Sequence, residues 1–154
     1  MALEQYKQII DEFCDLADID DVASVFETGL LKVGETPVRI EYLQSLDLCR
    51  LSIDLGMPLA GYQPGLYRLM LESNFSHIGE TLSTLTIEPS SGHAVLVVHV
   101  PLARLQSDLP LGFLLGEQLD PIVEAWHALI LQVDEESSLH CAQAGQPDGL
   151  ERYI

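Results

Sequence analysis

The sequence is poor in basic residues, and this shortage excludes two classes of partner. Seven Lys and Arg stand against 24 Asp and Glu, which gives a net charge of −17 and a pI near 4.3. Such a charge repels nucleic acid phosphates and anionic lipid headgroups, so we expect no nucleic acid partner and no membrane insertion. It favours solubility and attraction to basic partners.

Long hydrophobic runs and paired cysteines are also missing. No apolar run reaches the roughly 18 residues that a membrane-spanning helix needs. Residues 1–13 lack the basic start and apolar stretch of a signal peptide. Cys14, Cys49 and Cys141 are odd in number and form no CxxC motif. We interpret them as reduced thiols and expect a cytoplasmic protein.

The residues that carry chemistry do not stand in catalytic or metal-binding patterns. His93 and His99 fall on one face of an expected strand but roughly 20 Å apart. The Asp18–Asp21 segment lacks the Gly and Glu of a calcium loop. No nucleophile elbow or phosphate loop is present. The other histidines have no Cys or carboxylate at ligand spacing: His77, His127 and His140. We therefore expect no catalytic, metal or cofactor-binding residue, and no enzyme.

The chain nevertheless has the composition of a folded domain. It has 154 residues, of which 47% are apolar, enough for a core without disulfides. Residues 1–27 and 107–154 are strongly acidic, whereas the middle of the chain is close to neutral. We expect one domain over residues 1–133 and a flexible acidic tail over 134–154, which has no hydrophobic period.

Three helical segments are predicted. Residues 3–17 have an acidic outer face and place apolar residues at helical spacing. Residues 64–75 begin at Pro64 and are apolar nearly all round, so we expect burial on two sides. The last helical element spans about 108–132, with Asp120 as an N-cap and a kink or restart at Pro121. The apolar positions of the first segment are Tyr6, Ile9, Ile10, Phe13, Leu16 and Ala17.

Strands fill the remaining parts. Residues 24–55 show period-2 alternation and predict a three-stranded antiparallel meander. Two further strands are expected at 82–88 and 93–100, and the second is apolar on both faces, so both faces should be covered. The order αβββαββα indicates an α+β fold, a twisted antiparallel sheet with helices packed on it.

A series of short motifs follows along residues 64–131. A helix ends in Leu-x-x-Asn, a strand leads to an x-Pro-x-x-Gly turn, the next strand ends near Pro-Leu, and the last helix carries a Trp. In this order the chain resembles the type III secretion chaperones of the Tir-chaperone type. The resemblance covers residues 3–131, with sharp motifs only in the second half. The matching positions are Leu71, Asn74, Pro89, Gly92, Pro101, Leu102 and Trp126.

The resemblance implies a cytoplasmic homodimer that holds the N-terminal segment of a secreted effector in extended form before export. We expect the dimer to be built on the second helix and a neighbouring strand, through Leu66, Met70, Phe75 and Val98. We expect the effector segment to add a strand to an exposed sheet edge. The apolar pocket residues predicted for it are Tyr6, Phe26, Leu30, Leu31 and Leu48.

Three other interpretations stay open at this point. An adaptor or regulatory domain of the same fold, binding a folded partner outside secretion, has the same sequence chemistry. A small enzyme with an unrecognised site is a second alternative. An acidic DNA mimic is a third, which the neutral middle and high apolar content disfavour.

Overall fold

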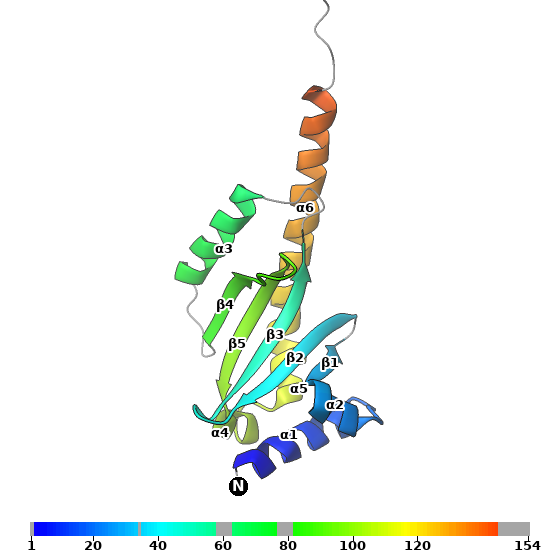
Figure 1. The fold of residues 1–154 in the computed structure, drawn as a ribbon, viewed down its shortest axis with the longest axis vertical. Coiled ribbons are helices and arrows are strands. Elements are labelled where there is room, and N and C mark those ends of the chain that lie inside the picture. Colours follow the sequence, from blue (N-terminus) through cyan, green and yellow to red (C-terminus); the bar gives the residue numbers. More distant parts are fainter. Residues whose placement is uncertain (1, 34, 58–62, 77–81, 145–154) are drawn as a thin grey trace, which may run out of the picture.

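The computed structural model describes residues 2–33, 35–57, 63–76 and 82–144 (Figure 1). Helices and strands are mixed, and the strands form one antiparallel sheet, so the α+β prediction is confirmed. In chain order the elements are α1 (Ala2–Leu16), α2 (Val22–Thr28), β1 (Leu30–Val33), β2 (Thr36–Leu43), β3 (Leu48–Gly56), α3 (Pro64–Ser76), β4 (Leu82–Ile87), β5 (Ala94–Pro101), α4 (Leu102–Gln106), α5 (Leu111–Phe113), the π-helix η1 (Leu114–Leu119) and α6 (Asp120–Ala144).

The sheet is open and twisted, with the strand order β1-β2-β3-β5-β4 (Figure 1). The first three strands form the expected meander, in which Ile40 pairs with Leu51. β5, and not β4, then pairs with β3 at the end of the meander, so that Leu51 also faces Val98. β1 and β4 are therefore the two edge strands.

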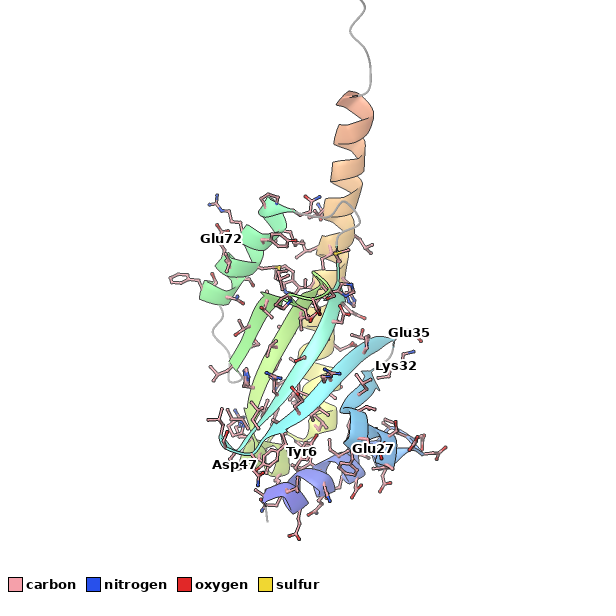
Figure 2. The ribbon with its side chains drawn as sticks, in the orientation of Figure 1. Tyr6, Glu27, Lys32, Glu35, Asp47 and Glu72 are labelled. Carbon is pink, nitrogen blue, oxygen red and sulfur yellow. The ribbon has the colours of Figure 1, made fainter. Side chains whose placement is uncertain are left out.

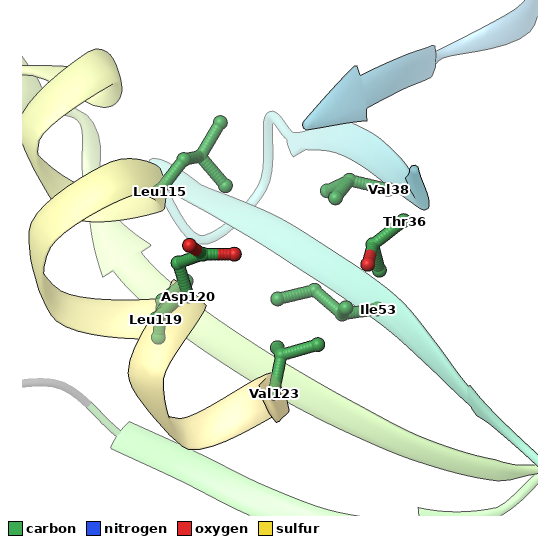
Figure 3. Close-up of a pocket in the computed structure, with 7 residues that line it drawn as sticks. All are labelled: Thr36, Val38, Ile53, Leu115, Leu119, Asp120 and Val123. Atoms are coloured by element: carbon green, nitrogen blue, oxygen red, sulfur yellow. The ribbon is translucent and has the colours of Figure 1, made fainter. Parts of the chain in front are cut away.

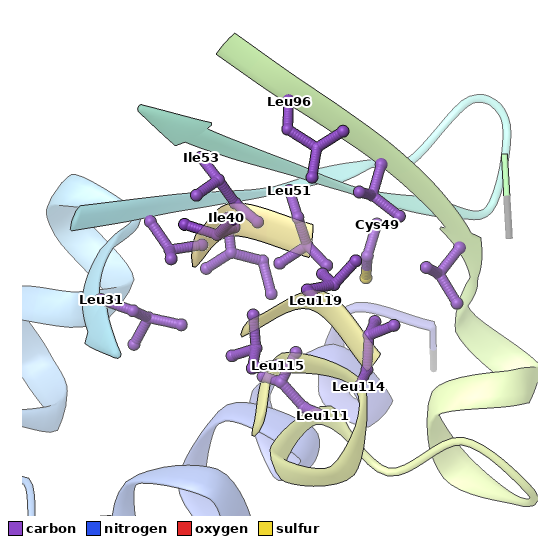
Figure 4. Close-up of a cluster of buried hydrophobic side chains, with 14 of the residues drawn as sticks. Leu31, Ile40, Cys49, Leu51, Ile53, Leu96, Leu111, Leu114, Leu115 and Leu119 are labelled. Carbon is purple, nitrogen blue, oxygen red and sulfur yellow. The ribbon is translucent and has the colours of Figure 1, made fainter. Parts of the chain in front are cut away.

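One face of the sheet carries the hydrophobic core (Figure 4). Successive side chains of a strand point to opposite faces, and β3 and β5 bury every second residue against the helices. α6 crosses behind the sheet, while α1 packs on α4 and α5 at one end (Figure 1). Each fully buried Leu or Ile contributes about 1.5–3 kcal/mol. The core positions of β3 and β5 are Cys49, Leu51, Ile53, Leu55, Ala94, Leu96, Val98 and Val100.

The second face of β5 is not covered, contrary to expectation. Val95, Val97 and His99 are half-buried on it, and none of the described helices crosses this face in Figure 1. The neighbouring strands explain the difference, because they place polar side chains such as Arg50 and Thr84 on the same face. An apolar strand can thus border a polar surface.

The start of the predicted meander is helical, which corrects the strand expected from Ser24. α2 spans Val22–Thr28 and contains Phe26. The side chain of Asp21 caps this helix, because its Oδ1 accepts a hydrogen bond from the N–H of Ser24 at 3.1 Å. A single cap residue and a glycine stop outweigh the strand preference of Val and Phe.

Replacing Asp21 by alanine is expected to lower the free energy of unfolding by about 1 kcal/mol, since the N–H of Ser24 loses its acceptor. Urea unfolding followed by circular dichroism measures the change. Asp21→Asn keeps an acceptor oxygen and should retain most of the stability. Asp20→Ala removes the same charge without a cap, and an equal loss in that variant would contradict the prediction.

The C-terminal helical element differs from the prediction in two ways. Asp120 is not an N-cap: it has helical dihedrals, and its N–H bonds to the carbonyl of Leu115. The wider π turn just before Pro121 accommodates a ring and a missing N–H inside a continuous helix. α6 also continues to Ala144, because Glu, Leu and Ala favour helix and the next residue is Gly145. Residues 134–144 of the expected tail are therefore helical, and residues 145–154 lie outside the described residues.

Candidate protein-binding surfaces

β1 has a partner strand on one side only. Ile40 donates its N–H to the carbonyl of Gly29 at 2.7 Å, directly before β1 begins. Because main-chain groups alternate in an antiparallel ladder, those of Leu30 and Lys32 point away from β2. The N–H of Leu30 donates to the hydroxyl of Thr28 at 3.2 Å. No strand among the described residues pairs with the rest of this edge, so it is a template for an added strand.

Gly29 turns the chain from α2 into β1. Its φ of 68° lies in the left-handed region, and its N–H donates to the carbonyl of Val25 at 2.8 Å, which ends α2. A Cβ at this position would stand 2.5 Å from the carbonyl oxygen of Ile40. Glycine is required for both reasons, and the place of β1 beside β2 depends on it.

Apolar and acidic side chains flank the β1 edge. Leu30 is 50% exposed, and Phe26 on α2 is half-buried against the core. Glu27 is exposed on α2 (Figure 2). Lys32 pairs with Glu35 at 3.3 Å, but both side chains are solvated, so the pair contributes little. An extended segment with apolar and basic residues suits this edge.

The five residues predicted to bind an effector do not form one pocket. Tyr6 and Leu31 are core residues, 9% and 4% exposed. Leu48 is half-buried at the far end of β3, where it pairs with Leu43. Leu30 is exposed in β1, and Phe26 lies on α2, half-buried against the core. Leu31 takes the inward position because neighbouring strand residues point to opposite faces. Tyr6 is buried because it lies on the apolar face of α1, which packs against the core.

Tyr6 packs α1 against the sheet and leaves little of its side chain exposed. Its ring stacks on Tyr42 with 5.3 Å between centroids. Burial, with smaller effects of Cys49 and Glu41, raises the pKa of Tyr6 to about 12. The hydroxyl of Tyr42 donates to Asp47 at 2.8 Å, and this bond raises the pKa of Tyr42. α1 is thereby held at the β2–β3 turn (Figure 2).

The uncovered face of the sheet is a shallow polar groove of about 620 Å³. Arg50 forms an ion pair with Glu41 across it, and Nδ1 of His93 lies 2.9 Å from both carboxylate oxygens of Asp54. Because charges on neighbouring strands are paired in this way, the groove is close to neutral in a chain of net charge −17. The apolar residues among its lining are Ile87, Pro89, Val95 and Val97.

α3 presents a different set of residues from the predicted dimer interface. Leu66 and Met70 are 2% and 3% exposed, and Val98 is fully buried in β5. These three belong to the core of a single chain and are not available to a second copy. Phe75 is 92% exposed and Leu71 is 68% exposed. The apolar outer face of α3 is therefore carried by Leu71 and Phe75.

Two further hollows lie beside α6. A narrow apolar pocket of about 10 Å³ lies between the sheet and η1, with Asp120 among its lining residues (Figure 3). It has room for about one water molecule. A wider groove of about 630 Å³ is lined by Thr36, Met57, His127 and Leu131 among others. Neither hollow gathers a set of catalytic side chains.

The thiols whose side chains are described are core residues. Cys14 and Cys49 are buried and free, and burial raises both pKa values, that of Cys49 to about 12. In the described ranges, no three His, Cys, Asp or Glu side chains come together as a metal site. No helix in those ranges has the length and apolar character to cross a membrane. His77 lies outside the described residues.

Sequence reasoning missed the structural roles of three positions. Gly29 sets the β1 edge, Asp21 creates α2, and Asn74 bonds to the opposite edge strand. Asp21 stands three residues before Ser24, the spacing of a helix N-cap, and Gly29 stands where a glycine commonly ends a helix. The sequence therefore contained local signals for both ends of α2.

In comparisons with known proteins, no family model and no curated protein matches this chain.

Proposed function

We propose that this protein is a type III secretion chaperone that binds the N-terminal segment of an effector in extended form in the cytoplasm. The observation that carries the proposal is the open β1 edge, on which Leu30 is exposed. An edge strand recognises unfolded chain through main-chain hydrogen bonds, which need no tertiary structure in the client. The acidic charge of α1 and α2 suits basic flanks on that segment.

The proposal includes a homodimer formed through the outer face of α3. Phe75 and Leu71 lie one helical turn apart on that face, and both are largely exposed in the single chain. α3 lies in the middle of the chain, which is close to neutral, so two copies would meet there with less repulsion than two strongly acidic surfaces. Because α3 lies along β4, each copy would keep its β1 edge on the side away from this interface.

Replacing Lys32 by proline tests the edge directly. The main-chain groups of Lys32 face away from β2, so proline removes an N–H that only an added strand would use. We expect an intact fold and a loss of client affinity of about tenfold or more. Fluorescence anisotropy with peptides tiled along the N-terminal segments of secreted effectors from the same organism measures this.

Lys32→Thr is the matched control, because it removes the same charge and keeps the N–H and the strand preference. Equal peptide affinity of the proline and threonine variants would show that the client does not add to β1. If no peptide binds and a folded partner does, the adaptor interpretation replaces the chaperone.

A further inference from the structure

The opposite edge of the sheet is occupied by a side chain. α3 lies along β4 (Figure 1), and Asn74 reaches the main chain of Leu85. Nδ2 of Asn74 donates to the carbonyl of Leu85 at 2.9 Å, and the N–H of Leu85 donates to Oδ1 of Asn74 at 2.7 Å. Both main-chain groups of Leu85 on that side are thus satisfied, and both bonds are partly buried.

This pair of bonds has the form that a neighbouring strand would supply. A strand residue offers one N–H and one C=O to the residue opposite, and a side-chain amide offers the same two groups from one planar unit. The sequence has a single asparagine, and it stands at this position. A hydrophobic residue would fill the space but leave both groups of Leu85 unpaired.

We propose that Asn74 closes the β4 edge against strand addition, so that an extended segment docks at β1 and not at β4. Asn74 is then a specificity-determining residue that acts at a distance from the docking edge. The part of this inference that concerns β1 rests on the proposed chaperone function. The closure of β4 does not, since an unprotected edge strand also pairs with a second copy of its own chain.

Asn74→Leu tests the closure, with a second copy of the chain as the probe. The variant keeps a side chain of similar size and loses both hydrogen bonds. We expect a species of larger mass than the wild type in sedimentation velocity at tens of micromolar, with an association constant about tenfold higher. Hydrogen exchange at the Leu85 amide should accelerate by a similar factor in the unassembled fraction.

Met70→Ala is the matched control. Met70 is 3% exposed on the same helix, so its truncation loosens the packing of α3 while both bonds of Asn74 remain. We expect the wild-type mass for this control. A larger species in both variants would overturn the proposal, because loss of α3 packing would then be the cause. Wild-type mass and wild-type exchange in Asn74→Leu would overturn it equally.

A third variant keeps the test open if Asn74→Leu does not fold. Asn74→Asp still accepts a hydrogen bond from the N–H of Leu85 but cannot donate one to its carbonyl. A larger species in this variant supports the closure of β4, and wild-type mass with wild-type hydrogen exchange overturns it. The double variant Lys32→Pro, Asn74→Leu separates the two edges. Assembly in the double variant supports closure of β4 even where no effector peptide binds β1, and absence of assembly there shows that β4 was not the edge used.

Discussion

Gly29→Ala is expected to destabilise the protein by about 3 kcal/mol or more, a large part of the stability of a domain of this size. Two costs add at this position. A φ of 68° is unfavourable for alanine, and its Cβ would stand 2.5 Å from the carbonyl oxygen of Ile40. That oxygen belongs to a central part of β2, which cannot move without disturbing β1 and β3.

Gly56 provides the control for this prediction. Its φ of 85° is also left-handed, yet a Cβ there meets nothing within 4 Å. Gly56→Ala should therefore cost about 1 kcal/mol from the backbone alone. Urea unfolding of both variants separates the two costs. An equal loss of unfolding free energy in the two variants would mean that the close contact between a Cβ at position 29 and the carbonyl of Ile40 adds no cost.

The regular parts of the fold follow from local pattern. β3 alternates Cys49, Leu51 and Ile53 with polar residues, and the structure buries those positions. α1 shows the apolar period of a surface helix, and its buried residues follow that period: Tyr6, Ile9, Ile10, Phe13 and Cys14. Such elements are predictable because the burial of one face sets the spacing of the apolar residues along the sequence. α2 was missed because seven residues are too few to show a period, and its cap decides the structure.

The candidate surfaces could be predicted only in part. Leu30 and Leu31 are adjacent and equally apolar, and only the pairing of β1 with β2 determines which one faces out. α3 is apolar nearly all round, so its sequence contains no stripe that separates a core side from an outer side. The packing of Leu66 and Met70 into the core settles that orientation. Edge strands likewise become visible only when the strand order is known.

Phe75→Asp is expected to weaken the proposed homodimer by about a hundredfold or more, since loss of a large apolar anchor with addition of a charge costs at least about 3 kcal/mol. Phe75 is 92% exposed in the single chain, so the substitution should leave the fold of the monomer intact. Met70→Asp cannot serve this purpose, because a charge at a position that is 3% exposed would unfold the chain itself.

Sedimentation equilibrium measures the dissociation constant, and circular dichroism checks the fold. Phe113→Asp is the matched control: Phe113 is 50% exposed on α5, at the other end of the molecule from α3 (Figure 1). It removes the same ring and adds the same charge, so a general effect of acidity on association would appear in both variants. Loss of the dimer in Phe75→Asp alone assigns the interface to α3. A wild-type chain that is monomeric at tens of micromolar, or an unchanged dissociation constant in Phe75→Asp, removes α3 as the dimer surface.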